Sequence, residues 1–286
     1  MERELWRVIR SGLRRVPRWW PRNASYSNRE ILAVLLWAAL HNKPICWACL
    51  RSSWPLQAWR RRLPDQSTMS RRLRDPDVWG DLRRLIDEVQ RDLGVTGTLV
   101  VDGKPLPVSN VSGDPDAARG WGAGIYARGY KLHAIIDRSR RLIDFDVRPL
   151  NAAESEVAAS MAAGLRVRAG VMLADASYDS NRLYAACESR GIQLLAPRKK
   201  PGTSISRVSR NAPSRIRSIE ILEGTNRGPA RLHDRKRRSI ERFFGTLATP
   251  STGLYALPPW VRRTTRVRHW VAAKLAINAA RIAIAA

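Results

Sequence analysis

Cysteine is scarce in this sequence, and so are acidic residues and long apolar runs. Only 3 of its 286 residues are cysteine, too few for a disulfide framework, which indicates a reducing compartment. Two of them belong to the stretch CWAC at 46–49, where a zinc site would need two more ligands and only His41 is close. We therefore interpret them as small apolar side chains on a buried helix.

The longest apolar runs are ILAVLLWAAL at 31–40 and AAKLAINAARIAIAA at 272–286. Both are too short or too interrupted to cross a membrane. The first twenty residues also lack the apolar stretch of a secretory signal peptide. These absences lead us to expect a soluble cytoplasmic protein without a membrane partner.

Negative charge is low, with 25 Asp and Glu against 51 Lys and Arg, and the net charge is +26. Residues 1–96 hold 19 basic and 10 acidic side chains, a net of +9. Residues 97–197 hold 12 and 11, a net of +1, and residues 198–286 hold 20 and 4, a net of +16. A neutral middle between basic flanks suits a compact core that grips a polyanion. We expect nucleic acid, with a ribosome-associated or membrane-surface protein as the alternative.

The N-terminal part predicts helices at 27–40, 45–51, 54–63 and 75–94. A further short basic helix follows Pro64 and begins with small polar residues. A helix-turn-helix recognition element presents such a helix to a DNA groove, although the solvated face of a helical bundle has the same composition. We predict an all-α, helix-turn-helix-like DNA-binding domain at 1–96, with DNA contacts from Thr68, Ser70, Arg71, Arg72 and Arg74.

The residue pattern changes at 98, where TLVVDGKPLPV predicts a buried strand. Residues 130–137 and 142–150 alternate as a hairpin, and two short apolar runs near 171–175 and 192–197 predict strands buried on both faces. Helices are expected between these runs, the first of them capped by Asn151. This order predicts a mixed α/β sheet with an antiparallel edge.

Beyond the sheet, residues 198–236 are rich in Arg, Ser, Pro and Gly, which predicts a basic loop or a partly ordered insertion. Two helices are expected after it, at about 233–248 and 260–285.

Two aspartates stand where a carboxylate is costly. Asp102 lies inside the buried strand, and Asp175 ends the apolar run VML, at the edge where open α/β sheets bind ligands. If their strands are neighbours, the carboxylates converge and must share a proton or bind a cation. Each could instead cap local backbone, and Asp179 is expected in the first turn of the next helix, complementing its dipole.

A third acid, Glu241, lies at the border of the apolar stripe of Ile240, Phe243 and Phe244 in the predicted helix 233–248. It is either a surface ion-pair partner of Arg237 or a third metal ligand carried across the sheet. Oxygen ligands without a Cys or His cluster favour Mg²⁺ or Mn²⁺ over zinc.

Four stretches in this order, LVVDGK, GYKLHAIID, LADASYDS and RSIERFFGTL, resemble the DDE domain of bacterial insertion-sequence transposases, of the insertion sequence four/five type. Those proteins belong to the ribonuclease H-like and retroviral-integrase superfamily. The resemblance covers about residues 97–280. It implies a ribonuclease H-like catalytic domain at 97–286, a mixed five-stranded sheet flanked by helices.

The resemblance also implies roles for single residues. Asp102, Asp175 and Glu241 match the catalytic triad that holds the metal ions, and Arg237 matches the arginine four residues before the glutamate. Some groups of the family carry a tyrosine seven residues before the glutamate and a lysine seven after it, where this chain has Asp234 and Ala248.

The implied activity is metal-dependent DNA cleavage at transposon ends and strand transfer to target DNA, with two Mg²⁺ or Mn²⁺ ions about 3.5–4 Å apart. The implied partners are double-stranded DNA, as terminal inverted repeats and target, and a second copy of the chain. Binding to DNA would make the protein nucleoid-associated. A non-catalytic repressor, decayed or domesticated, and a plain nuclease remain alternatives. Further DNA backbone contacts are expected from Arg235, Lys236, Arg237 and Arg238.

Overall fold

The computed structural model describes residues 1–17, 20, 24–55, 62–122, 124–166, 170–201, 211–226, 228–249 and 252–285. They form two compact units, Met1–Leu93 with Thr246–Ala286 and Gly94–Gly245. The division at residue 94 is close to the predicted boundary at 96, but the C-terminal segment groups with the N-terminal helices rather than with the sheet. The extents 1–96 and 97–286 as functional domains stay a prediction.

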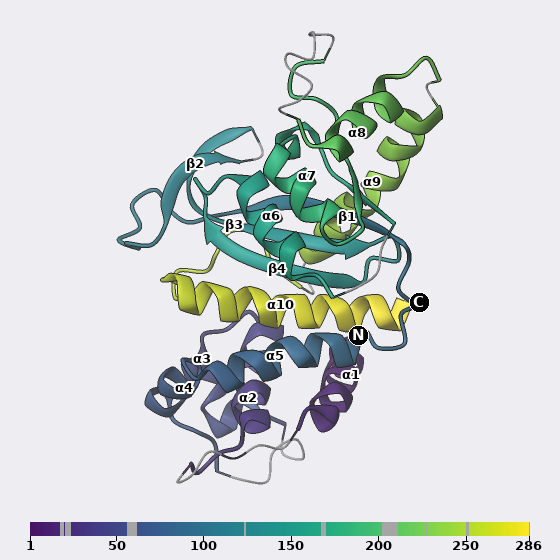
Figure 1. Cartoon of the computed structure of the whole chain (residues 1–286). Helices are drawn as coiled ribbons and strands as arrows, with labels where there is room; N and C mark the ends of the chain where they lie inside the picture. The colour runs from purple at the N-terminus through teal and green to yellow at the C-terminus, as the bar shows by residue number, and fades with distance from the viewer. Residues whose placement is uncertain are drawn as a thin grey trace. The chain divides into compact units, whose positions relative to one another are not determined.

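The first unit is helical, as Figure 1 shows. Its elements are α1 (Glu2–Arg15), α2 (Asn28–Leu40), α3 (Ile45–Ala48), η1 (Arg51–Ser53), α4 (Gln66–Arg72), α5 (Pro76–Val89) and α10 (Thr264–Ala285). The predicted start of α2 is confirmed, since Ser27 and Glu30 form a capping box. In the described parts of the chain, no helix combines the length and apolarity that crossing a membrane requires.

Two expectations for this unit need comment. The CWAC helix exists as α3, but Cys46 is exposed and Cys49 is half-buried, so the expected burial is wrong. A helix of four residues is too short to bury a whole face. Most of the helix expected at 54–63 lies outside the described residues, because 56–61 are not among them.

The second unit is built on one mixed sheet. Its strands are β1 (Thr98–Pro107), β2 (Ala118–Gly122), β3 (Ile125–Asp137), β4 (Leu142–Pro149), β5 (Val171–Leu173) and β6 (Gln193–Leu195). The order is β2-β3-β1-β5-β6, with β4 also paired to β3. The β1–β5 and β5–β6 pairs are parallel and the others antiparallel, which confirms the predicted mixed sheet with an antiparallel side. The residues of β2, ARGWG, neither alternate nor form an apolar run, so this strand was not predicted.

Helices cover the sheet. They are α6 (Glu154–Gly164), α7 (Asn181–Glu188), α8 (Pro213–Glu223) and α9 (Gly228–Leu247), with the short helix η2 (Ala176–Tyr178) after β5. Helix α6 begins at Glu154 with Ala153 as N-cap, so the prediction that Asn151 caps it is wrong. Helix α8 lies within 198–236, where a loop or a partly ordered insertion was expected. Figure 1 shows α6 and α7 over one face of the sheet and α9 behind it.

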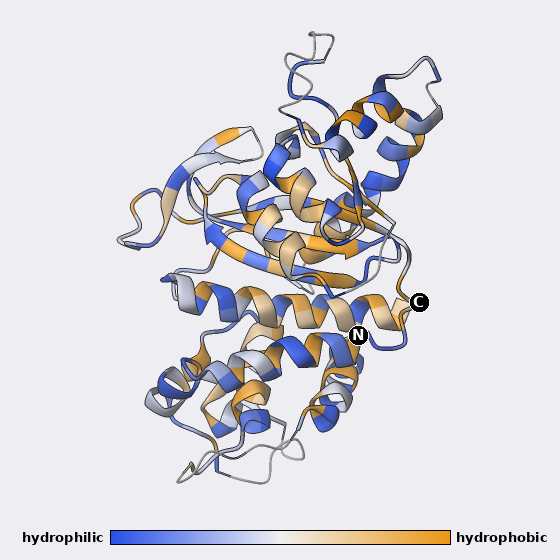
Figure 2. Cartoon of the chain, in the orientation of Figure 1, coloured by the Kyte–Doolittle hydropathy of each residue, from blue (hydrophilic) through white to orange (hydrophobic). Residues whose placement is uncertain are grey.

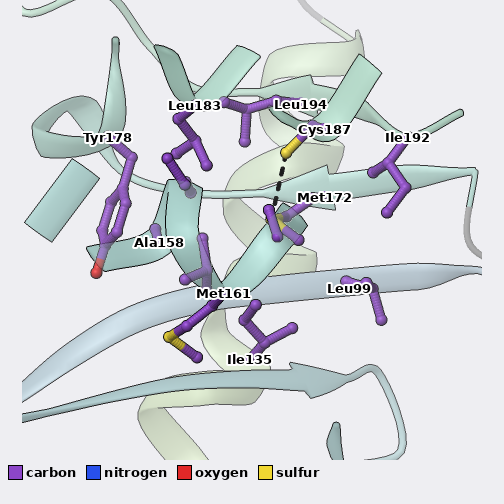
Figure 3. Close-up of a cluster of buried hydrophobic side chains, with 14 of the residues drawn as sticks. Leu99, Ile135, Ala158, Met161, Met172, Tyr178, Leu183, Cys187, Ile192 and Leu194 are labelled. Atoms are coloured by element: carbon purple, nitrogen blue, oxygen red, sulfur yellow. Dashed lines mark hydrogen bonds between the residues drawn. The ribbon is translucent and has the colours of Figure 1, made fainter. Parts of the chain in front are cut away.

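A single apolar cluster joins α6 and α7 to the sheet (Figure 3). Leu99 and Val101 of β1 and Met172 of β5 point into it, together with Ala158 of α6 and Leu183 of α7. Because side chains alternate along a strand, Val100 and Asp102 point to the opposite face, where Arg237 of α9 contacts Asp102. The core therefore directs the Asp102 carboxylate toward α9.

Candidate active site

The first two predicted acids are brought together by the pairing of β1 with β5. The strands run parallel, and the last paired residues are Val100 and Leu173. Asp102 and Asp175 each stand two residues beyond that pair, so they occupy equivalent places at the carboxyl end of β5. The prediction that the strand of Asp102 and the VML strand are neighbours is confirmed.

Negative charge is concentrated around Asp102. Its pKa is raised to about 6, chiefly by burial, and the carboxylates of Asp175 and Glu154 contribute to the rise. A hydrogen bond from the Gly103 N–H at 2.7 Å and the charge of Arg237 act in the opposite direction. In a chain with a net charge of +26, this small region favours a cation.

Asp175 is held by its own turn. As N-cap of η2, its Oδ1 accepts from the Ser177 N–H at 2.7 Å and lies 2.5 Å from the Ser177 hydroxyl. The local capping roles that the sequence leaves open are thus present for both aspartates. Capping and metal binding are compatible, because a carboxylate has several lone pairs.

Glu241 reaches this region through Arg237. The Arg237 guanidinium places Nη1 3.6 Å from Asp102 Oδ2, and its Nη2 donates to Glu241 Oε1 at 2.9 Å. Ile240 and Phe243 are buried, as the stripe predicted. One side chain of α9 therefore links the first and third predicted acids.

Helix α9 is also fixed against the sheet by a residue that the sequence did not single out. His233 is buried, and its Nε2 lies 3.1 Å from the carbonyl oxygens of both Ala174 and Leu195. Because carbonyls only accept, this nitrogen carries a proton and donates. A lone histidine gives no signal of such a role in the sequence.

Glu154 is the other acid that the sequence did not single out. It begins α6, where an acid is ordinary, and only the structure brings it beside Ser177 and Asp102. The neighbouring Glu156 has the same sequence context, yet its side chain pairs with Arg182 at the surface.

The donor set suits a hard divalent cation such as Mg²⁺ or Mn²⁺, because it consists of carboxylate oxygens. Asp102 and Asp175 supply the negative charge. The Arg237 guanidinium, itself a cation, contacts both Asp102 and Glu241. No three Asp, Glu, His or Cys side chains of the described residues are grouped tightly enough to hold an ion together. For Glu241 to join the two aspartates on one ion, Arg237 must move.

The predicted DNA contacts in α4 and in the turn after it, where Arg74 lies, fall into two groups. Arg71 and Arg74 are exposed, and Thr68 and Ser70 are half-buried. Arg72 differs from the expectation of a solvent-facing contact, since only 7% of it is exposed. Its guanidinium donates to the Tyr26 carbonyl at 2.7 Å and to Asn28 Oδ1, so it stabilises the helical unit.

The basic residues of α9 follow one face. Arg235 and Arg238 are exposed, and Arg231 and Arg242 extend the same face by one turn at each end. None of these four side chains has an ion-pair partner within the described residues. Lys236 and Arg237 are half-buried. Figure 2 shows the hydrophilic residues along α9 in blue.

Asp179, the other acid of LADASYDS, has a structural role. It lies before α7 rather than in its first turn, so the expected dipole interaction is wrong. Its two oxygens accept from Arg215 Nε and Nη2 of α8 at 2.7 and 2.8 Å, and its side chain is only 4% exposed. This ion pair attaches α8 to the loop between η2 and α7.

Comparison with known families agrees with the fold. Residues 94–278 match the model of the transposase DDE domain. No curated protein and no solved structure matches the chain significantly. The mixed sheet flanked by helices is the ribonuclease H-like fold that was predicted, and both the fold and the transposase predictions are confirmed. The chain belongs to the transposase DDE domain family and is a DNA-binding enzyme of DNA transposition.

Proposed function

We propose that Asp102, Asp175 and Glu241 are the catalytic triad of this transposase and together hold two divalent ions, Mg²⁺ or Mn²⁺. The observation that carries the proposal is the parallel β1–β5 register, which puts Asp102 level with Asp175. The contact of Arg237 with both Asp102 and Glu241 supports the third assignment. Bound to these carboxylates, the ions would activate the attacking oxygen and stabilise the leaving oxygen in an in-line displacement at phosphorus.

Each residue contributes through its position. Asp102 and Asp175 stand on a rigid sheet, so their spacing is set by the backbone. Glu241 is on α9, which His233 anchors to the carbonyls of Ala174 and Leu195. Before a metal ion binds, Arg237 neutralises part of the charge of Asp102 and Glu241.

The proposed reaction has two displacements at phosphorus. In cleavage, a water molecule loses a proton, its oxygen bonds to phosphorus and the bond to the 3′-oxygen breaks; the 3′-oxygen takes up a proton, which leaves a 3′-hydroxyl and a 5′-phosphate. In joining, the freed 3′-hydroxyl loses its proton, bonds to a target phosphorus and displaces a target 3′-oxygen, which takes up a proton. One site can serve both steps, because in each of them one oxygen displaces another at phosphorus through the same type of transition state.

The proposed substrates are the terminal inverted repeats of an insertion sequence of the four/five type and a target duplex, bound by a homodimer. The proposed DNA contacts are Thr68, Ser70 and Arg71 on α4, Arg74 in the turn after it, and the exposed arginines of α9. Arg72 is left out of this set because it is buried.

Glu241→Gln separates the enzyme from a DNA-binding repressor. The change keeps side-chain size and helix propensity and removes one charge. Cleavage of DNA carrying the flanking genomic repeats should fall at least about 100-fold, as expected for loss of a metal ligand. DNA binding, measured by fluorescence anisotropy, should persist.

Glu220→Gln removes one charge from an exposed position of α8 and serves as the control that should cleave normally. If the wild-type chain binds the repeats but shows no metal-dependent cleavage, the repressor alternative is correct. If it cleaves but never joins ends to target DNA, the chain is a nuclease.

A further inference from the structure

Glu154 lies near the carboxyl end of β5, where Asp102 and Asp175 form the proposed metal site, and both of its carboxylate oxygens have hydrogen-bond partners. Oε1 accepts from Lys131 Nζ at 2.5 Å, and Oε2 lies 2.7 Å from the Ser177 hydroxyl oxygen. The Lys131 and Glu154 side chains are 8% and 22% exposed, so this ion pair is largely shielded from solvent. A Cβ at Gly103, the residue after Asp102, would lie 3.2 Å from Glu154 Oε1. Lys131 and β1 therefore fix the Glu154 carboxylate.

The Ser177 hydroxyl stands between two carboxylates. Its oxygen is 2.7 Å from Glu154 Oε2 and 2.5 Å from Asp175 Oδ1, and both contacts are within hydrogen-bond distance. A hydroxyl has one proton to donate, so it serves one carboxylate at a time. Asp175 Oδ1 already accepts from the Ser177 N–H at 2.7 Å, whereas the hydroxyl is the one hydrogen-bond donor to Glu154 Oε2 among the described residues.

We propose that Glu154 is a positioning residue of the metal site, acting on Asp175 through the Ser177 hydroxyl. When Ser177 donates to Glu154, the Asp175 carboxylate keeps its charge for a divalent ion, and its orientation is fixed by the backbone N–H alone. In Glu154→Gln the hydroxyl donates to Asp175 Oδ1 instead, so both lone pairs of that oxygen accept hydrogen bonds from Ser177 and only Oδ2 is left for the ion. This inference rests on the proposed function, since it assumes that Asp175 is a metal ligand.

The Glu154→Gln variant tests the idea by Mn²⁺ binding to the full chain, measured by electron paramagnetic resonance. Binding should weaken about 10-fold, the lower end for loss of a group that orients a metal ligand. The Mg²⁺ concentration for half-maximal cleavage should rise by the same factor, with little change in rate at saturating Mg²⁺. Glu156→Gln is the matched control, because Glu156 is on the same turn of α6 and pairs with Arg182 at the surface.

A Ser177→Ala background identifies the route of the effect. If Glu154 acts through the hydroxyl, Glu154→Gln should cause no further loss of Mn²⁺ affinity once Ser177 is alanine. An equal loss in both backgrounds would mean that Glu154 acts by its own charge or as a direct ligand, and it would overturn the proposal. Unchanged Mn²⁺ affinity in the single Glu154→Gln variant would overturn it as well.

Folding and the parent proposal are tested separately. Glu154→Gln leaves Lys131 as a buried cation without its partner, which can destabilise the sheet. The double variant Lys131→Met/Glu154→Gln removes both partners, and it should show the same 10-fold loss of Mn²⁺ affinity in a folded protein.

Asp175→Asn tests the proposed catalytic triad, on which this inference rests. If Asp175→Asn lowers Mn²⁺ affinity and the Glu154 variants do not, only the positioning role fails. If Asp175→Asn has no effect, the proposed triad fails.

Discussion

At the scale of single residues, the charged Asp102 carboxylate lowers the stability of the folded protein when no metal ion is bound. Its pKa rises to about 6 chiefly because it is buried, with Asp175 and Glu154 adding to the effect. In an unfolded chain the same carboxyl titrates near its ordinary value of about 3.9. The folded protein therefore binds a proton at Asp102 more tightly than the unfolded chain does.

This difference predicts a pH dependence of stability in metal-free buffer. Between about pH 4 and 6 the folded state binds more protons at this position, so linkage lowers the free energy of unfolding as the pH rises through that window. Asp102→Asn should remove the decrease. Above pH 6 the variant should melt a few degrees higher than wild type, the shift that about 1–2 kcal/mol produces in a chain of this size.

Thermal melting with a chelator at pH 4 and pH 8 measures the effect. The gain from Asp102→Asn should be present at pH 8 and much smaller at pH 4. A variant that is less stable than wild type at pH 8 would mean that the contact with Arg237 outweighs the burial of the charge.

At the scale of elements, α9 combines three tasks on three faces. Ile240 and Phe243 are buried, and Arg237 with Glu241 stands beside Asp102. The exposed arginines at 231, 235, 238 and 242 repeat at spacings of four, three and four, which keeps them on one side of a helix. This geometry puts a row of positive charge next to the proposed site of phosphoryl transfer.

Replacing these four exposed arginines with glutamine should weaken the salt dependence of DNA binding. Each phosphate contact contributes about 0.9 to the slope of log affinity against log salt, so losing all four should reduce its magnitude by up to about 3.6. Anisotropy titrations across a series of salt concentrations measure it. Arg182→Gln with Arg217→Gln is the control, because both side chains are exposed but paired with acids. A slope equal to that of wild type would mean that DNA binds to another surface.

At the scale of the whole molecule, the mixed sheet and five of its six strands could be predicted from the sequence, because those five read as apolar or alternating runs, whereas β2 does not. The same apolar runs made Asp102 and Asp175 conspicuous, since burying a carboxylate in or beside an apolar strand costs free energy unless it has a partner. Glu154 could not be identified, because nothing local distinguishes it from Glu156. The burial of Arg72 also escaped, since it depends on Tyr26 and Asn28, more than forty residues earlier in the chain.

The grouping of α10 with the N-terminal helices also could not be predicted. Periodicity predicts that a helix exists and which faces are apolar, but the choice of partner depends on long-range packing. The match of residues 94–278 to the transposase DDE domain therefore spans parts of both compact units. A family match gives the extent of sequence similarity, whereas the compact units give the extent of packing, so their boundaries need not coincide.

The central claim is that Asp175, rather than its neighbour Asp179, belongs to the catalytic site with Asp102. Cleavage of duplex DNA carrying the flanking repeats, in Mg²⁺, by wild type, Asp175→Asn and Asp179→Asn tests it most directly. Asp175→Asn should bind DNA but cleave at least about 100-fold more slowly, as expected for a lost metal ligand. Asp179→Asn should lose thermal stability through its pairing with Arg215, yet its folded fraction should cleave at close to the wild-type rate. Wild-type cleavage by Asp175→Asn, together with loss of cleavage by folded Asp179→Asn, would contradict the account.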